Sequence, residues 1–147
     1  MARGNRHPPM SPLRLLFGAS RRADGLFVRA MGKIELSPRQ FMVLQAVAAA
    51  DGLSQVGIMA ATGLDHASTA DFVRRLVAKG WLRRRRTKRD ARFYAVRLTS
   101  EGREVVALAE TAARRVDGEL MRGIEPTQKT PVLDALRLMA QRTANST

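Results

Sequence analysis

The 147-residue chain carries 26 Lys and Arg against 13 Asp and Glu, which gives a formal net charge of +13 at pH 7. A chain this basic favours a polyanionic partner, and nucleic acid is the first candidate. The chain contains no cysteine, which excludes disulfides, thiol redox sensing and cysteine nucleophiles. The length favours one folding domain with its own hydrophobic core.

Membrane, metal and catalytic functions also find little support in the sequence. No apolar run approaches the roughly 20 residues that cross a bilayer, and residues 1–10 are polar, unlike a signal peptide. His7 and His66 lack the spacing of a metal pair, and there is no glycine-rich phosphate loop and no pair of carboxylates in an apolar setting. We therefore expect a cytoplasmic protein that has no cofactor, no metal, no membrane partner and no enzymatic activity.

The first predicted element is a long helix within residues 11–34. Ser11 suits the N-cap, and Pro12 suits the first helical position, where no backbone N–H is needed. Apolar residues recur behind them at helical spacing, although Gly18 and Gly25 weaken the middle of the helix.

A second helix start follows at Ser37. The pair Ser37 and Gln40 predicts a capping box, in which each side chain bonds the backbone N–H of the other residue. Asp51 and Gly52 break this helix. Its predicted buried face consists of Phe41, Leu44, Val47 and Ala48.

The next two predicted helices have the pattern of a helix-turn-helix. Ser54 caps a short helix, and Gly63 turns the chain because glycine accepts a positive φ. Asp65 then caps a helix over residues 66–79 whose outer face is polar. The predicted inward residues are Ile58 and Ala61 in the first helix, and Thr69, Phe72, Val73, Leu76 and Val77 in the second.

A predicted β-hairpin follows, with strands over residues 81–87 and 93–98 joined by a charged tip. The second strand alternates in character, which predicts that Tyr94, Val96 and Leu98 are buried. A hairpin directly after a helix-turn-helix is a candidate wing.

Residues 83–92 are strongly basic, since seven of the ten are Lys or Arg and only Asp90 is acidic. A charge run is most often a solvated face, but its place after the helix-turn-helix pattern favours contact with DNA. Asp90 is close enough in the chain to orient the guanidinium of Arg92 for the minor groove. The alternative is an exposed ion pair that stabilises only the hairpin.

The predicted DNA contacts lie on the outer face of helix 66–79 and on the hairpin. Residues near the N-terminus of such a helix reach base edges, although His66 suits an ordinary capping-region role equally well. Asp71 is repelled by phosphates unless it pairs with Arg75, which we favour, or accepts from a cytosine amine. The full set is His66, Ala67, Ser68, Ala70, Arg74, Arg75, Arg84, Arg86, Lys88, Arg89, Asp90 and Arg92.

Two further helices are predicted towards the C-terminus. Residues 99–102 open a fifth helix that ends at Gly123, and Pro126 begins a sixth, with Pro131 tolerable only near its first turn. Both are too long for the small core beside them, which suits them to dimer formation. Their apolar stripes are Val105, Leu108, Ala109, Ala112, Val116 and Leu120, and then Val132, Leu133, Leu136 and Met139.

Taken together, these segments resemble the multiple-antibiotic-resistance regulator (MarR) family of bacterial repressors. The resemblance is clearest over residues 36–102 and looser from residue 13 to the end. It rests on Leu36-Ser37-Pro38-Arg39-Gln40-Phe41, Thr62-Gly63-Leu64-Asp65, Arg74-Arg75-Leu76-Val77-Ala78-Lys79-Gly80, and Asp90-Ala91-Arg92 followed by Leu98-Thr99-Ser100-Glu101-Gly102.

The resemblance implies a homodimer whose first, fifth and sixth helices interlock and whose two lobes contact an inverted-repeat operator. Helix 66–79 would lie in the major groove, and Arg92, oriented by Asp90, would enter the minor groove. Family members commonly bind a small, often aromatic acid in a cleft between the dimer helices and the winged lobe, and then release DNA. The candidate effector contacts here are Arg21, Arg22, Asp24 and Arg39, for which ordinary surface charge is the alternative.

We therefore predict a mainly α fold, formally α+β, with a flexible arm at residues 1–10 and a single domain at residues 11–147. A winged helix-turn-helix lobe at residues 36–98 lies between dimerisation helices at residues 11–34 and 99–144. The predicted function is that of a ligand-responsive repressor that binds double-stranded DNA as a homodimer. The alternative is an architectural protein that coats nucleic acid without sequence preference, which the basic hairpin would serve equally well.

Overall fold

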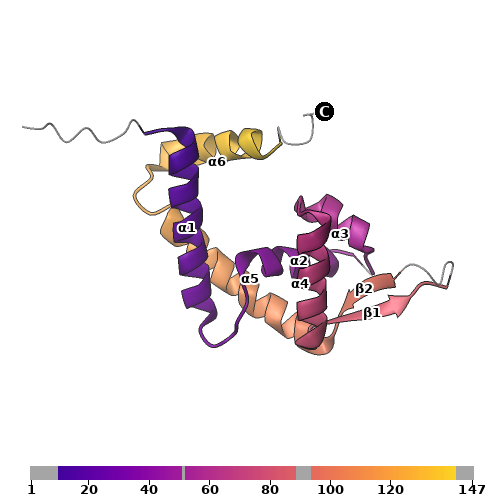
Figure 1. The fold of residues 1–147 in the computed structure, drawn as a ribbon. Coiled ribbons are helices and arrows are strands. Elements are labelled where there is room, and N and C mark those ends of the chain that lie inside the picture. Colours follow the sequence, from indigo (N-terminus) through magenta and orange to yellow (C-terminus); the bar gives the residue numbers. More distant parts are fainter. Residues whose placement is uncertain (1–9, 51, 89–93, 142–147) are drawn as a thin grey trace, which may run out of the picture. The chain divides into compact units, whose positions relative to one another are not determined.

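The computed structural model describes residues 10–50, 52–88 and 94–141. The chain divides into two compact units, residues 1–116 and 117–147, which are described separately. In the part of the chain that the structure describes, no helix is long and apolar enough to cross a membrane. The elements, labelled in Figure 1, are α1 (Pro12–Met31), α2 (Pro38–Ala48), α3 (Gln55–Thr62), α4 (His66–Ala78), β1 (Leu82–Arg86), β2 (Tyr94–Leu98), α5 (Ser100–Leu120) and α6 (Pro126–Gln141).

α1 begins where the sequence predicts. The backbone N–H of Arg14 donates to Ser11 Oγ (3.3 Å), and Pro12 is the first helical residue. The helix continues without a break through both of its internal glycines. It ends at Met31, earlier than predicted, because Gly32 takes a φ of +63° and turns the chain.

The capping box at the start of α2 is confirmed. The N–H of Ser37 donates to Gln40 Oε1, and the N–H of Gln40 donates to Ser37 Oγ, both at 3.1 Å. α2 ends at Ala48, before the predicted break, of which residue 51 lies outside the described residues. The prediction that Ala48 is buried is wrong, because this last residue of the helix is exposed, whereas Val43 is buried.

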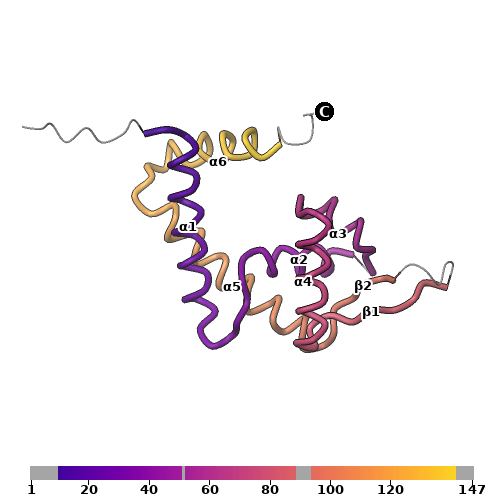
Figure 2. Tube along the Cα trace, viewed as in Figure 1, coloured from indigo at the N-terminus to yellow at the C-terminus, as the bar shows by residue number. Residues whose placement is uncertain are grey.

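α3 and α4 form the predicted helix-turn-helix, whose course is visible in Figure 2. Ser54 Oγ accepts from the N–H of Gly57 (3.0 Å), and Gly63 ends α3 in the left-handed conformation at φ +71°. Ile58 is fully buried. The inward placement predicted for Ala61 is wrong, since α3 has only 8 residues, presents a narrow face to the core and leaves Ala61 exposed.

α4 is capped by Asp65, as predicted. Thr69 is fully buried, and its hydroxyl donates to the backbone oxygen of Asp65 (2.8 Å), so this buried polar group is satisfied. The buried face is narrower than predicted, with Thr69, Val73 and Leu76 buried and Phe72 and Val77 half-buried.

The wing is the hairpin of β1 and β2, which are antiparallel and place Arg86 opposite Tyr94. Leu53 adds an unpredicted third strand segment, since it donates to Val96 O (3.0 Å) and accepts from Val96 N (2.8 Å). Val96 and Leu98 are buried as predicted. The prediction that Tyr94 is buried is wrong, because it lies at the tip end of the paired strands and is 45% exposed.

The core of the first unit is formed by α2, α3, α4, the base of the wing and the buried face of α5, which carries Val105, Val106, Ala109, Ala112 and Val116. α1 packs against it through the stacked rings of Phe27 and Phe41, whose centroids are 5.3 Å apart. The largest fully buried apolar side chains are Val43, Leu44, Val47, Ile58, Val73, Leu76 and Leu82.

A junction of backbone contacts joins α4, β1 and α5. The N–H of Thr99 donates to Trp81 O (3.1 Å), and the Thr99 hydroxyl donates to Gly80 O (2.6 Å) and accepts from the N–H of Gly102 (3.0 Å). A Cβ atom at Gly102 would lie 2.0 Å from the backbone oxygen of Trp81, so only glycine allows this approach. The start of α5 is therefore held directly against the turn between α4 and the wing.

The second unit contains the last residues of α5 and all of α6. Pro131 lies inside α6 rather than in its first turn, and the helix continues through it to Gln141. None of the described side chains of α6 is buried. Its exposed large apolar side chains are Leu133, Leu136, Leu138 and Met139.

We expect Gly102→Ala to destabilise the protein by about 1–3 kcal/mol, because the new methyl group meets backbone that cannot move aside. Gly118→Ala in the same helix is the matched control, since nothing lies within 4 Å of its Cβ position. That control should be neutral or gain up to about 1 kcal/mol of helix stability. Denaturant unfolding followed by circular dichroism measures both variants, and equal stabilities would contradict the junction.

Candidate nucleic-acid interface

The outer face of α4 carries the first group of predicted contact residues. Its N-terminal half presents small or neutral side chains, and its C-terminal half presents two arginines. Within this group, His66 and Ala67 are exposed, Ser68 and Ala70 are half-buried, and Arg74 and Arg75 are exposed.

The N-terminus of α4 is ordered by Asp65. One carboxylate oxygen accepts from the backbone N–H of Ser68 (2.7 Å), and the other accepts from the Ser68 hydroxyl (2.9 Å). These two bonds, the backbone bond first, lower the pKa of Asp65. The proton of the Ser68 hydroxyl is thereby engaged, so this side chain offers DNA an acceptor rather than a donor.

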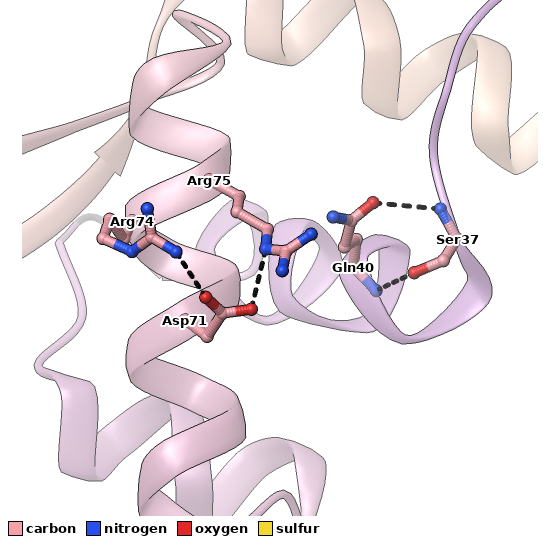
Figure 3. A network of polar contacts seen from close by, with 5 residues as sticks. All are labelled: Ser37, Gln40, Asp71, Arg74 and Arg75. Carbon is pink, nitrogen blue, oxygen red and sulfur yellow. Dashed lines mark hydrogen bonds and ion pairs between the residues drawn. The ribbon is translucent and has the colours of Figure 1, made fainter.

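Asp71 binds both arginines of α4 (Figure 3). Its Oδ1 accepts from Arg74 Nη2 at 2.6 Å, and its Oδ2 accepts from Arg75 Nε at 2.7 Å. The hydrogen bond from Arg74, followed by the charge of Arg75, lowers the pKa of Asp71. The pairing with Arg75 was predicted, whereas the pairing with Arg74, at the equally favourable spacing i, i+3, was missed.

The wing carries the second group of predicted contact residues. β1 has four consecutive exposed arginines, residues 83–86. Because successive side chains of a strand point to opposite faces, Arg84 and Arg86 share one face with Val96 and Tyr94 across the hairpin. The Arg86 guanidinium lies 5.8 Å from the centre of the Tyr94 ring, a cation–π contact. Tyr94 was predicted to be buried, so this contact was missed. The signal that could have found it is the position of Tyr94 opposite Arg86, beside the tip of the hairpin.

One hollow lies between the wing and the start of α4. It has a volume of ≈ 650 Å³ and is bordered by Arg84 of β1 and by His66 and Ala70 of α4. Predicted contact residues from two elements therefore surround one opening in the first unit. Val56, Val73 and Val96 contribute apolar side chains to the lining of this hollow.

The tip of the wing is described only in part. Lys88 is exposed. Arg89, Asp90 and Arg92 lie outside the described residues, so the orienting contact between Asp90 and Arg92 stays a prediction.

The predicted effector contacts are dispersed. Arg21, Arg22, Asp24 and Arg39 are all exposed. None of them lines the hollow between the wing and the start of α4. Their role stays a prediction.

The helix-turn-helix, the wing and their basic surfaces define a winged helix-turn-helix transcriptional regulator. Residues 34–92 match the model of the MarR family. Over this segment the chain is similar to the MarR family, as its sequence motifs indicate, and the curated relatives that it matches are named as transcriptional regulators.

Individual relatives agree with this assignment. The transcriptional regulator HosA of Escherichia coli is 29% identical over 105 residues, which are 71% of this chain and 78% of that protein. BpsR of Bordetella bronchiseptica, whose DNA binding is regulated by 6-hydroxynicotinic acid, is 26% identical with a TM-score of 0.81, over 93% of this chain and 98% of that one. PcaV of Streptomyces coelicolor, solved with its natural ligand, is 27% identical with a TM-score of 0.81, over 89% and 92% of the two chains.

We expect acid to remove the stabilisation that the Asp65 cap provides. The pKa of Asp65 is lowered from 3.8, so this stabilisation is present above that value and is lost as pH falls through the lowered pKa. The difference in melting temperature between the natural chain and Asp65→Ala should therefore be clear at neutral pH and should narrow in strong acid. Asp65→Asn, which accepts a hydrogen bond but does not ionise, is the control and should show a smaller difference. A gap that stays constant with pH would contradict the role of the charge.

Proposed function

We propose that this regulator is a homodimeric repressor that binds an inverted-repeat operator and is released by a small effector. The observation that supports it best is the single hollow bordered by Arg84 of the wing and by His66 and Ala70 of α4. Winged helix-turn-helix proteins need the recognition helix and the wing on one side of the subunit, so that both meet the same duplex.

α4 is the proposed recognition helix. The side chains at its N-terminal end, His66 and Ala67, are exposed and suitably placed to approach base edges in the major groove. Arg74 and Arg75, nearer the other end, suit contacts with phosphates or with guanine. The helix thus offers both positioning and sequence-reading contacts.

The wing is the proposed minor-groove element. Arg84, Arg86 and Lys88 are exposed along it, and a narrow minor groove has the negative potential that attracts such side chains. By family resemblance, Arg92 enters the groove and Asp90 orients it. Arg89 adds positive charge at the same tip.

Exposed apolar surface supports the proposed dimer. In the first unit, α1 exposes a series of large apolar side chains, and α5 exposes Leu108. In the second unit, α6 has no buried side chain among its described residues. Exposed apolar helix faces of this kind are normally covered by another chain. The exposed residues of α1 are Leu13, Leu15, Leu16, Phe17 and Val28.

The proposed effector is a small aromatic acid or a conjugate of such an acid. BpsR responds to 6-hydroxynicotinic acid, and PcaV was solved with its natural ligand. Arg21, Arg22, Asp24 and Arg39 are the proposed contacts, and they stand on the sequence alone.

We expect the protein to sediment as a dimer and to select one inverted repeat from a random duplex library. Binding should persist against competitor DNA at physiological salt, because base contacts add to the phosphate contacts that salt weakens. Equal affinity for all duplexes would instead favour the architectural alternative. A monomer at micromolar concentration would contradict the two-fold arrangement.

We expect Arg92→Ala to weaken operator binding by roughly 1–3 kcal/mol, because a minor-groove contact is lost. Arg137→Ala removes the same charge from α6, where Arg137 pairs with Asp134 at 2.8 Å, and serves as the matched control. Fluorescence anisotropy with the selected operator measures both. Equal affinities of the two variants would remove Arg92 from the interface, provided that both sediment like the natural chain.

A further inference from the structure

We propose that Asp71 is a specificity-determining residue, which holds Arg74 and Arg75 so that α4 discriminates the operator from other duplexes. The proposal rests on the proposed function, since it assumes that α4 contacts DNA. Asp71 does not itself attract phosphate, because its side chain is negatively charged. Its carboxylate binds one arginine with each oxygen.

The geometry leaves useful donors on both arginines. A guanidinium carries five N–H groups. Arg75 gives its Nε–H to Asp71, so the two terminal nitrogens keep the paired edge that matches guanine or a phosphate. Arg74 gives a hydrogen of Nη2 and keeps its Nε–H and Nη1 hydrogens. Asp71 therefore fixes the direction of two side chains without using up their capacity to bind DNA.

Fixing these side chains favours one bound arrangement. A free arginine loses much rotamer freedom when it binds, and a side chain that is already oriented loses less. This gain is available only where the duplex presents acceptors in the matching positions. On other sequences, the same orientation leaves the donors misplaced.

The charge of Asp71 acts in the same direction. The lowered pKa keeps the carboxylate ionised at neutral pH, so Asp71, Arg74 and Arg75 together carry one net positive charge instead of two. The side chain of Asp71 is 38% exposed. Its carboxylate therefore repels any phosphate that approaches it closely. Non-specific binding, which depends almost entirely on phosphate attraction, is therefore weakened more than operator binding.

A purely structural role is the alternative, and its contribution to stability is small. Ion pairs between exposed side chains add little to folding, because solvent screens them. Asp71 variants should accordingly fold, and their effect should appear in DNA binding. The chain offers a matched control in Glu119, which pairs with Arg122 at 2.5 Å with the same exposure of 38% on the acidic side chain.

The test compares Asp71→Asn with Glu119→Gln, because both changes remove one negative charge from an i, i+3 pair. Anisotropy titrations would use the selected operator and a scrambled duplex of equal length at several salt concentrations. For Asp71→Asn, we expect affinity for the scrambled duplex to rise roughly three- to tenfold, and the preference for the operator to fall by about as much. The salt slope on the scrambled duplex should steepen by about 0.9, the effect of one additional phosphate contact. Glu119→Gln should change none of these three quantities, and Asp71→Glu should keep most of the preference.

The outcomes separate the two proposals. If the natural chain prefers the operator and Asp71→Asn keeps both the preference and the salt slope, the role of Asp71 is overturned and the proposed function stands. Equal changes in Asp71→Asn and Glu119→Gln would show an effect of total charge only and would also overturn it. If the natural chain shows no preference for any duplex, both proposals fail together.

Discussion

The junction of Thr99 and Gly102 with the turn at residues 80–81 is the constraint on which the arrangement of the winged lobe depends. The chain ends α4 and begins β1 over residues 78–82, and it ends β2 and begins α5 over residues 98–100. The Thr99 hydroxyl bonds Gly80, after the end of α4, and Gly102, at the start of α5. The absence of a side chain at Gly102 lets the backbone of Trp81, just before β1, approach closely. Because the Thr99 hydroxyl and the close backbone approach at Gly102 hold these segments together, the wing keeps its direction relative to α4. The common hollow beside Arg84 follows from that direction.

Local side-chain chemistry then adapts each element to its role. Serine and aspartate caps fix where the helices of the lobe begin, so the exposed face of α4 is set by its first residue. Carboxylates also orient side chains on the outer face of α4. Asp65 orients Ser68, and Asp71 orients Arg74 and Arg75. In a chain with a net charge of +13, each carboxylate placed among arginines also limits indiscriminate attraction to phosphate.

Patterns that act over one or two turns could be predicted from the sequence. The caps at Ser37, Ser54 and Asp65 depend only on neighbouring residues, and all of them form. Features that depend on distant segments could not be predicted in this way. The bond between Leu53 and Val96 joins residues far apart in the chain. Likewise, the exposure of Tyr94 depends on its place at the tip end of the paired strands, which strand alternation does not encode.

The same distinction applies to the interface. The pairing of Asp71 with Arg75 follows from helical spacing, and so does the one with Arg74, which was overlooked. The approach of Arg84 to His66 and Ala70 requires the packed lobe, since no local pattern relates a strand to the preceding helix. The effector contacts were inferred from charge alone, and charge without a shared cavity does not define a site.

The small strand contact at Leu53 has a consequence for solubility. A two-stranded hairpin has two open edges, and each is a template on which another chain can assemble into an extended sheet. Leu53 occupies the outer edge of β2 at Val96, while the opposite edge belongs to the arginine-rich β1. If the β1 edges of two molecules came together, their arginines would face each other and repel. The lobe therefore resists aggregation while keeping all of its basic side chains.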